Sequence, residues 1–291
     1  MTIRLEPGAQ IGRYRVIGPL GRGGMGGVVE VEDAAGVRYA MKTPLVDVDA
    51  SGAVTQRFAR EANALRVLDH PNLVAAVDVV VADGVLCLVM AKVVGRTLTR
   101  AIAAGLPTRQ VLVLARQILD GVGHAHAHGF VHRDLKPDNV LLADRGGWEQ
   151  AQIIDFGLVK LVGDAEAVFG AAALTRTGLV FGTPAYMAPE QALGQLVDGR
   201  ADLYALGVIV FEALTGRLPF SDPDPHALAR LHVKAPPPRL IDVVGHAPWC
   251  TAQLTALVDG ALAKPRERRF PDAAAMRAAL DDAFRSLDHL G

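Results

Sequence analysis

A short polar stretch between two apolar runs constrains this chain more than any other feature. Residues 130–131 (FV) and 140–142 (VLL) are apolar, and residues 132–139 between them read HRDLKPDN. Apolar runs of this length are typical of short buried strands, so the polar residues must lie on a turn between them. The stretch therefore predicts a turn that presents charged and amide side chains.

These side chains suit one kind of chemistry. Asp134 can accept a proton from a hydroxyl group, and Lys136 can neutralise an anion while it is transferred. Asn139 offers an amide oxygen of the kind that a hard cation binds. A second acid, Asp155, ends another apolar run in the sequence IIDFG. Asn139 and Asp155 together are predicted to hold a magnesium ion.

Composition excludes several classes of protein. With 291 residues, of which 51% are hydrophobic, the chain can bury a sizeable core. The 30 basic and 31 acidic residues nearly balance, so no nucleic-acid partner is expected. Cys87 and Cys250 lack metal-ligand spacing and indicate two thiols in a reducing compartment. The apolar runs 73–91 and 203–211 are interrupted or short, so we expect a cytoplasmic protein with no membrane span.

A glycine-rich segment predicts a phosphate-binding hairpin. Residues 21–28 (GRGGMGGV) fit the pattern G-x-G-x-x-G-x-V, whose glycines let backbone N–H groups approach phosphate oxygens. Dinucleotide-binding domains use similar glycines, but there the glycines open a helix. Here the alternating residues 28–32 and then 37–42 read as two strands joined by a turn. No G-x-x-x-x-G-K-[ST] sequence occurs, so a P-loop is excluded.

An acid on a predicted helix gives Lys42 a partner. The pattern predicts a helix at about residues 55–68, with Glu61 among the apolar residues of its inward face. A buried carboxylate needs a counter-ion, and Lys42 at the end of a strand is the obvious candidate. The helix is expected to stop before Pro71.

The remaining elements predict an α+β fold. Strands at 73–81 and 85–90 complete an antiparallel sheet of five strands with one helix. Helices follow: one from Pro107 to about His124, the apolar 203–214, and 272–287. Asp202 precedes the second of these helices and is predicted to cap its N-terminus.

The ordered motifs together resemble those of the eukaryotic-like bacterial serine/threonine protein kinases. The resemblance runs from about Tyr14 to Phe284. It implies a two-lobed protein kinase fold, with an N-terminal extension at 1–12, a small nucleotide-binding lobe at 13–93 and a mainly helical large lobe at 94–291. The chain departs from the family pattern at Ala91, where relatives often have an acid, at the extra Gly27, and at Val29.

The resemblance also implies the ligands and their residues. ATP and Mg²⁺, or Mn²⁺ in its place, are the expected cofactors. Asp134, Lys136, Lys42 and Glu61 would be catalytic, and Asn139 and Asp155 would bind the metal. The residues implied in nucleotide binding are Leu20, Gly21, Arg22, Gly23, Gly24, Met25, Gly26, Gly27, Val28, Ala40, Lys42, Met90, Val93 and Leu141.

A long segment after Asp155 is expected to regulate the site. Similar kinases are phosphorylated at the positions of Thr175 and Thr177, and Arg133 could pair with a phosphothreonine. By resemblance, the Thr183 hydroxyl would bond within the catalytic loop. Arg268 would pair with Glu190, and Asp202 would brace the turn that contains Asp134.

The resemblance implies transfer of the γ-phosphate of ATP to serine or threonine in proteins. Autophosphorylation of the long segment would use a transient homodimer. The alternative from another class is a pseudokinase, a scaffold that binds nucleotide or partner proteins without chemistry. A small-molecule kinase of similar fold is a more distant alternative, because residues 182–190 resemble a platform for protein substrates.

Overall fold

A computed structural model describes most of the chain as two compact units. Described residues up to Val94 form the small unit, and those from Gly95 onward form the large unit. The described residues are 5–23, 26–44, 65–82, 85–154 and 184–288.

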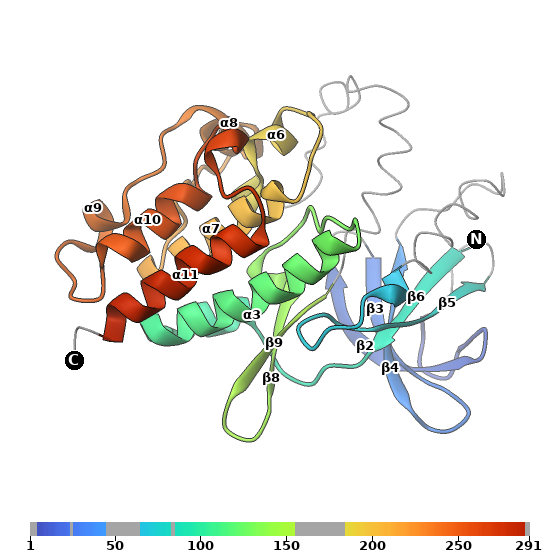
Figure 1. The fold of residues 1–291 in the computed structure, drawn as a ribbon. Coiled ribbons are helices and arrows are strands. Elements are labelled where there is room, and N and C mark those ends of the chain that lie inside the picture. The colour runs from blue at the N-terminus through green and yellow to red at the C-terminus, as the bar shows by residue number, and fades with distance from the viewer. Residues whose placement is uncertain (1–4, 24–25, 45–64, 83–84, 155–183, 289–291) are drawn as a thin grey trace. The chain divides into compact units, whose positions relative to one another are not determined.

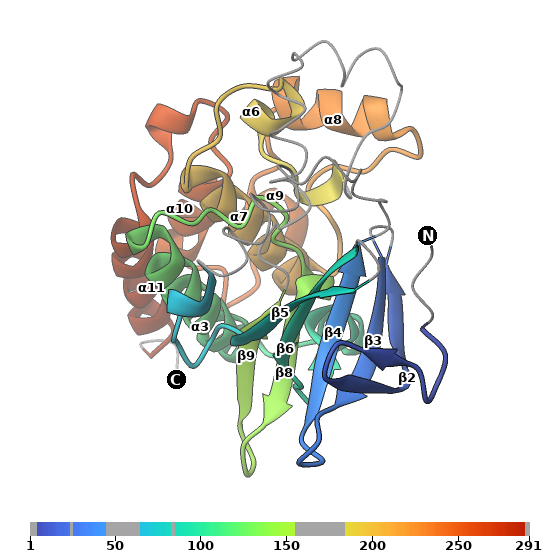
Figure 2. The ribbon, with the colours of Figure 1, turned by 90° about the vertical axis from the view of Figure 1, so that its right-hand side faces the viewer.

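The small unit is built on one antiparallel sheet with the strand order β1-β2-β3-β4-β6-β5 (Figure 2). The five predicted strands are present, and the two-residue β1 adds a sixth at one edge. A single 3-10 turn, η1, precedes β5. The elements are β1 (Gln10–Ile11), β2 (Tyr14–Gly23), β3 (Gly26–Glu32), β4 (Arg38–Pro44), η1 (Leu65–Val67), β5 (Ala76–Ala82) and β6 (Val85–Ala91).

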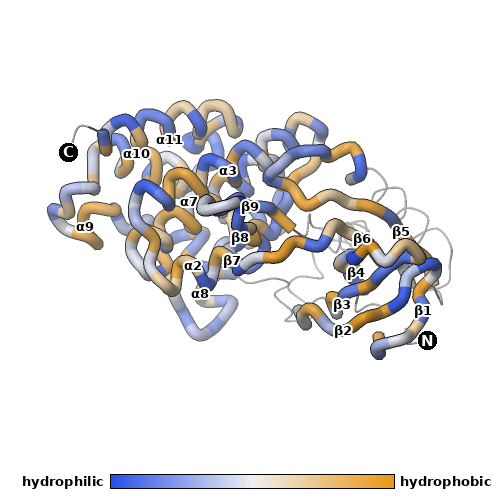
Figure 3. The backbone as a smooth tube through the Cα atoms, turned by 90° about the horizontal axis from the view of Figure 1, so that it is seen from below, coloured by the Kyte–Doolittle hydropathy of each residue, from blue (hydrophilic) through white to orange (hydrophobic). Residues whose placement is uncertain are grey.

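Alternation along the strands places one face of this sheet in a core. In β3, Val29 and Val31 are buried, while Glu30 between them pairs with Lys92. Successive side chains of a strand point to opposite faces, so one face is apolar and the other carries polar groups. Figure 3 shows the resulting alternation of hydrophilic and hydrophobic residues along β2, β3 and β4. The core consists of Ile11, Tyr14, Val16, Val29, Val31, Met41, Cys87 and Val89.

The two edges of the sheet approach each other, so the sheet is curled. The Tyr14 hydroxyl at the start of β2 donates to Asp78 Oδ2 on β5 at 3.0 Å. A Cβ placed on Gly12 would lie 2.6 Å from Cγ1 of Val80, also on β5. Gly12 has a φ of +56°, a conformation that glycine adopts readily. The turn between β1 and β2 therefore needs glycine both for its backbone and for the close contact.

The large unit combines a small sheet with a group of helices (Figure 1). Its three strands have the order β7-β8-β9, and the helix α3 packs on β9. The elements are β7 (Arg96–Thr97), α2 (Leu98–Ala104), α3 (Thr108–Ala127), η2 (Pro137–Asn139), β8 (Val140–Asp144), β9 (Glu149–Ile153), η3 (Pro184–Tyr186), α6 (Pro189–Ala192), α7 (Arg200–Thr215), α8 (Pro225–Lys234), α9 (Leu240–Val244), α10 (Ala252–Ala261), η4 (Arg266–Arg268) and α11 (Ala273–Asp288).

Helix α7 is the centre of the large unit. Every residue from Ala201 to Phe211 is buried, so the helix has no solvent-facing side along this length. It contacts both α3 and α10, and α11 packs on α3 and α10. A helix that is apolar all round is buried on all sides, as the sequence of α7 predicts.

A glycine sets the distance between α7 and α10. A Cβ placed on Gly207 would lie 2.6 Å from Cβ of Ala261. Alanine favours helix over glycine by about 1 kcal/mol in an exposed helix. Here we expect Gly207→Ala instead to lower the free energy of unfolding by about 1 to 3 kcal/mol, because the core becomes overpacked. Urea unfolding measures the effect, and adding Ala261→Gly should recover part of the loss. A Gly207→Ala variant as stable as the wild type would contradict this packing.

The predicted elements can be compared with those observed. The helix predicted from Pro107 is confirmed, and it extends to Ala127 with Val111, Leu114, Ala115, Ile118, Val122 and Ala125 buried. Most of the helix expected at 55–68 lies outside the described residues; the structure has η1 at its end. Among the helices that the structure describes, none has the length and apolar character needed to cross a bilayer.

Candidate active site

In the large unit, the polar turn gathers two of the predicted catalytic side chains and one predicted metal ligand. Lys136 Nζ lies 3.2 Å from Asp134 Oδ2. Asn139 Nδ2 donates to the Asp134 backbone oxygen at 2.8 Å and approaches Asp134 Oδ2 at 3.3 Å. Asn139 lies in η2, which Pro137 opens, and β8 begins at the next residue. The structure therefore brings a carboxylate, an ammonium group and an amide together, as predicted from their spacing.

The Asp202 side chain holds the backbone of this turn in place. Its Oδ2 accepts from the His132 backbone N–H at 2.8 Å, and its Oδ1 accepts from the Arg133 backbone N–H at 2.8 Å. His126 Nε2 also lies 2.8 Å from Oδ2. Burial is the largest single influence and opposes ionisation of Asp202, but the hydrogen bonds and charge interactions with His126 and His132 together hold the pKa of this carboxyl below its usual value. The predicted bracing of the catalytic turn by Asp202 is present.

The prediction that Asp202 caps its own helix is wrong. Helix α7 begins at Arg200, so Asp202 lies inside its first turn, and Gly199 is the N-cap residue. A Cβ on Gly199 would lie 2.7 Å from two ring atoms of His126. Gly199 therefore leaves room for the imidazole that contacts Asp202. The carboxylate is used by the catalytic turn because its two oxygens face His132 and Arg133.

The backbone of the turn is strained at one residue. Arg133 has a φ of 64°, and among the described residues it alone combines a positive φ with a side chain. Such a conformation costs about 1 to 2 kcal/mol for a residue with a Cβ. Asp202 binds the Arg133 N–H, and Gln191 Nε2 donates to the Arg133 oxygen at 2.7 Å. Contacts at both backbone atoms hold the strained residue and, with it, the neighbouring Asp134.

His132 links the turn to the end of β9. Its Nδ1 accepts from the Asp134 backbone N–H at 3.3 Å, and its Nε2 lies 3.0 Å from the Ile154 backbone oxygen. Since Nδ1 accepts, Nε2 carries the proton and donates to Ile154. The buried ring therefore fixes the backbone of Asp134 relative to the residue that precedes Asp155. Sequence reasoning missed this role of His132, and also that of Gln191.

In the small unit, four predicted nucleotide-binding residues share one face of the sheet. Val28 pairs with Lys42 across β3 and β4, and Ala40 pairs with Met90 across β4 and β6. Paired residues lie on the same face, and Ala40 and Lys42 are two residues apart. This face is opposite to the one on which Val29 and Met41 enter the core. The three apolar side chains suit a flat apolar group of a ligand, and Lys42 beside them suits an anionic group of the same ligand.

Other predicted nucleotide-binding residues are placed as follows. Leu20 and Gly21 are exposed near the end of β2, and Gly21 pairs with Val28. Arg22 and Gly23 end β2 and pair with Gly27 and Gly26 of β3. Val93 is half-buried after β6 in the small unit, and Leu141 is half-buried in β8 of the large unit. The predicted residues that lie outside the described part of the chain are Gly24, Met25, Glu61, Asp155, Thr175, Thr177 and Thr183.

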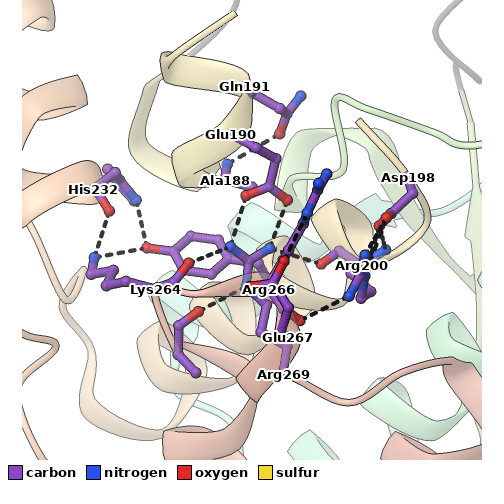
Figure 4. Close-up of polar contacts among 12 residues, drawn as sticks. Ala188, Glu190, Gln191, Asp198, Arg200, His232, Lys264, Arg266, Glu267 and Arg269 are labelled. Carbon is purple, nitrogen blue, oxygen red and sulfur yellow. Dashed lines mark hydrogen bonds and ion pairs between the residues drawn. The ribbon is translucent and has the colours of Figure 1, made fainter. Parts of the chain in front are cut away.

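A buried ion pair anchors the segment that resembles a substrate platform (Figure 4). The Glu190 carboxylate in α6 accepts two hydrogen bonds from the Arg269 guanidinium. Nη1 donates to Oε1 at 2.7 Å, and Nη2 donates to Oε2 at 2.7 Å. The prediction of Arg268 as the partner of Glu190 is wrong by one residue. Arg268 ends the 3-10 turn η4 and is exposed, whereas Arg269 follows in extended conformation and turns inward.

Further contacts support this platform from α7 and from Lys264. The Tyr186 hydroxyl in η3 donates to Glu212 Oε2 of α7 at 2.6 Å. Helix α8 packs on η3, and its last turn is held by Lys264, whose Nζ donates to the His232 oxygen at 2.7 Å and to the Tyr204 hydroxyl at 3.2 Å. The Tyr204 hydroxyl lies 2.9 Å from His232 Nδ1. Burial and the charge of Arg269 lower the pKa of Lys264 to about 8.

His232 makes the stability of this region depend on pH. Burial, followed by the charge of Lys264, lowers the pKa of His232 to about 4, whereas an unfolded histidine has a pKa of about 6.5. Between these values the unfolded chain binds a proton that the folded chain does not, so stability falls as the pH drops from about 6.5 to 4. We expect this single group to remove up to about 3 kcal/mol over that range.

Urea unfolding from pH 6.5 down to pH 4.5 tests this expectation with two variants. The replacement His232→Gln removes the titrating group and should flatten the acid side of the stability profile. His246→Gln replaces an exposed histidine and should leave the profile as it is in the wild type. Equal slopes for wild type and His232→Gln would contradict the role given to His232.

Comparison with known proteins identifies the family of this chain. The model of the family "Protein kinase domain" matches residues 14–280. The serine/threonine-protein kinase Pkn1 of Myxococcus xanthus is 40% identical over 279 residues, which are 95% of this chain and 39% of that protein. PrkC of Bacillus subtilis is 33% identical over 276 residues, 94% of this chain and 41% of that protein. This chain thus spans about two fifths of the length of these curated relatives.

The fold has a solved counterpart. The crystal structure of the kinase domain of PknI from Mycobacterium tuberculosis matches with a TM-score of 0.74 at 26% identity, covering 96% of this chain and 100% of that one. The sequence match extends over nearly the whole chain and includes the braced turn with Asp134. The chain therefore belongs to the protein kinase family, within which Pkn1 and PrkC, two of its similar relatives, are bacterial serine/threonine protein kinases.

Proposed function

We propose that this protein is a serine/threonine protein kinase that transfers the γ-phosphate of ATP to hydroxyl groups of proteins. The observation that carries the proposal is the Asp134 carboxylate, held beside Lys136 and Asn139 on a strained turn that Asp202 and Gln191 fix in place. Phosphoryl transfer requires a protein mainly to position groups and to neutralise charge. A preorganised turn of this kind supplies both.

The described residues have distinct roles in this proposal. Asp134 orients the acceptor hydroxyl and takes its proton. Lys136 neutralises charge that develops on the transferred group. Val28, Ala40 and Met90 form the apolar surface for the adenine, and Lys42 on the same face binds phosphate oxygens.

Members of the protein kinase family use ATP and a divalent metal, and for this chain we propose Mg²⁺. The Asn139 amide fits a metal site, because its nitrogen donates to Asp134 and its oxygen remains as the hard ligand that Mg²⁺ prefers. Asp155 is the second proposed ligand. Held by these two residues, the ion would neutralise negative charge on the phosphate groups of ATP.

The substrate and regulation are proposed on the sequence pattern. Lys136 two residues after Asp134 fits a serine or threonine acceptor, and the Glu190–Arg269 pair anchors the platform that would receive it. Thr175 and Thr177 are the proposed sites of autophosphorylation, through a transient homodimer. The alternative, a pseudokinase scaffold, is disfavoured because Lys42, Asp134 and Asp155 are all present in the sequence.

Mass spectrometry after incubation with Mg-ATP tests the proposal. The purified chain should gain phosphate on serine or threonine, with Thr175 or Thr177 among the first sites. A sample without Mg²⁺ should gain none. If no phosphate appears while Mg-ATP still raises the melting temperature, the scaffold alternative replaces the kinase proposal. If Mg-ATP does not bind, the assignment of Lys42 and the glycine-rich hairpin is wrong.

A further inference from the structure

The N-terminal segment before β1 is fixed to the small unit by backbone hydrogen bonds. The Gly8 N–H donates to the Val16 oxygen at 2.8 Å, and the Val16 N–H donates to the Ala9 oxygen at 2.8 Å. Pairing of β1 with β2 continues this contact. In Figure 3 the tube next to the N-terminal mark runs beside β1 and β2. Within the segment 1–12 that we expected to be an extension, Gln10 and Ile11 form an edge strand of the sheet, and Gly8 and Ala9 are hydrogen-bonded to β2.

Leu5 in this segment packs at one end of the core. Its side chain lies against the buried cluster, and Cδ1 is 3.1 Å from the position that a Cβ on Gly27 would take. Thr43 Oγ1 is 3.7 Å from the same position and donates to the Gly27 oxygen at 3.2 Å. Leu5 therefore fills the space where a side chain at position 27 would stand.

This contact lies directly behind two proposed nucleotide-binding residues. Gly27 pairs with Thr43, and the next pair along the same two strands is Val28 with Lys42. Because neighbouring residues of a strand point to opposite faces, Leu5 supports the pair from the side away from the proposed ligand. Gly27 does not have a positive φ, so its backbone does not by itself require glycine. A side chain at this position would require Leu5 to shift by a few tenths of an ångström.

We propose that Leu5 is a positioning residue that holds the β3–β4 pair so that Val28 and Lys42 meet ATP in the right place. The inference rests on the proposed function in one respect, namely that ATP is the ligand of this face. Its distinctive consequence is a compensating pair. Removing the Leu5 side chain leaves a space beside Gly27, and a methyl group added at Gly27 fills part of it.

Steady-state kinetics of the wild type and four variants test the proposal. For Leu5→Ala we expect KM for ATP to rise about 3-fold to 10-fold, with kcat and KM for a protein acceptor unchanged. For Gly27→Ala we expect a smaller rise, because the added methyl pushes Leu5 aside. The double variant should lie closer to the wild type than Leu5→Ala does, and Leu5→Met should behave as the wild type.

A matched control uses the same substitution at an exposed site. Leu196 in the large unit is 89% exposed, so Leu196→Ala removes the same atoms without removing packing. It should leave KM for ATP unchanged. If Leu5→Ala does not fold, the smaller truncation Leu5→Val replaces it in every comparison.

Hydrogen exchange of the nucleotide-free protein separates this inference from the proposed function. Amides of residues 26–29, 42 and 43 should exchange faster in Leu5→Ala and should recover in the double variant. If the wild type binds no Mg-ATP, the kinase proposal fails, while exchange still reports on the contact. Unchanged exchange would show that Leu5 does not support these strands. Faster exchange with an unchanged KM for ATP would overturn the positioning role.

Discussion

Asp134→Asn is expected to lower the rate of phosphoryl transfer roughly 100-fold to 10,000-fold while leaving the fold intact. Asparagine has the shape of aspartate, and the bond from Asn139 Nδ2 to the backbone oxygen of residue 134 remains. The variant loses only the negative charge beside Lys136 and the ability to take a proton. The measurement is the single-turnover rate of phosphate transfer from Mg-ATP, together with the melting temperature.

The matched control is Asp144→Asn. Asp144 is exposed at the end of β8 in the same unit, and its Oδ1 accepts from the Gly147 N–H at 3.0 Å. Asparagine keeps that acceptor, so the rate should equal the wild-type rate. If Asp134→Asn transferred phosphate within a few-fold of the wild type, Asp134 would not be the proton acceptor. If Mg-ATP binding were also lost, the effect would not lie in the chemical step.

Arg269→Ala should lower the free energy of unfolding by about 3 to 5 kcal/mol. The pair with Glu190 is buried on both sides, with side chains 0% and 4% exposed. Removing the guanidinium leaves a buried carboxylate without a counter-ion. It also removes the donors that bind the Ala263 oxygen at 2.7 Å and the Lys264 oxygen at 2.9 Å. Urea denaturation measures the loss.

The neighbouring arginine is the control for this experiment. Arg268 is exposed, so Arg268→Ala should change stability by less than about 0.5 kcal/mol. Replacing both charges, as Glu190→Gln with Arg269→Met, should cost less than the sum of the two single changes, because neither charge is left alone. Equal losses for Arg268→Ala and Arg269→Ala would contradict the observed pairing.

Local sequence was sufficient to predict the catalytic turn. Asp134, Lys136 and Asn139 lie within six residues, so their proximity follows from the turn itself. Strand β8 follows the turn as predicted, but residues 130–131 before the turn form no strand and are only half-buried, so the expectation of a buried strand on that side is wrong. The strands that carry Val28, Lys42 and Met90 were predicted from alternation and turn residues in the same way. The turn depends on a short connection, and the strands depend on alternation with a period of two residues. A sequence shows both directly.

Predictions that depended on an exact residue at the end of an element failed. Arg268 and Arg269 are adjacent, and only the course of the 3-10 turn η4 decides which of them points inward. Asp202 was assigned as a cap because the apolar run starts at Leu203, whereas α7 starts at Arg200. An apolar pattern locates the buried part of a helix but not its first turn.

Contacts between distant segments were invisible in the sequence. Gln191 binds the Arg133 oxygen across 58 residues, and Gly199 makes room for His126. Leu5 precedes β1 and Gly27 lies in β3, and only the curled sheet brings them together. Gly27 departs from the family pattern, and its close contact with Leu5 can be seen only in the three-dimensional structure.

The buried helix α7 has a consequence for how such a chain can change in evolution. Asp202 near its start holds the catalytic turn, and Glu212 near its end binds Tyr186 of the platform. One residue inserted between them would rotate one contact relative to the other by about 100° and shift it by about 1.5 Å. We therefore expect insertions and deletions to be confined to loops such as 145–148, and the number of residues from 202 to 212 to stay the same.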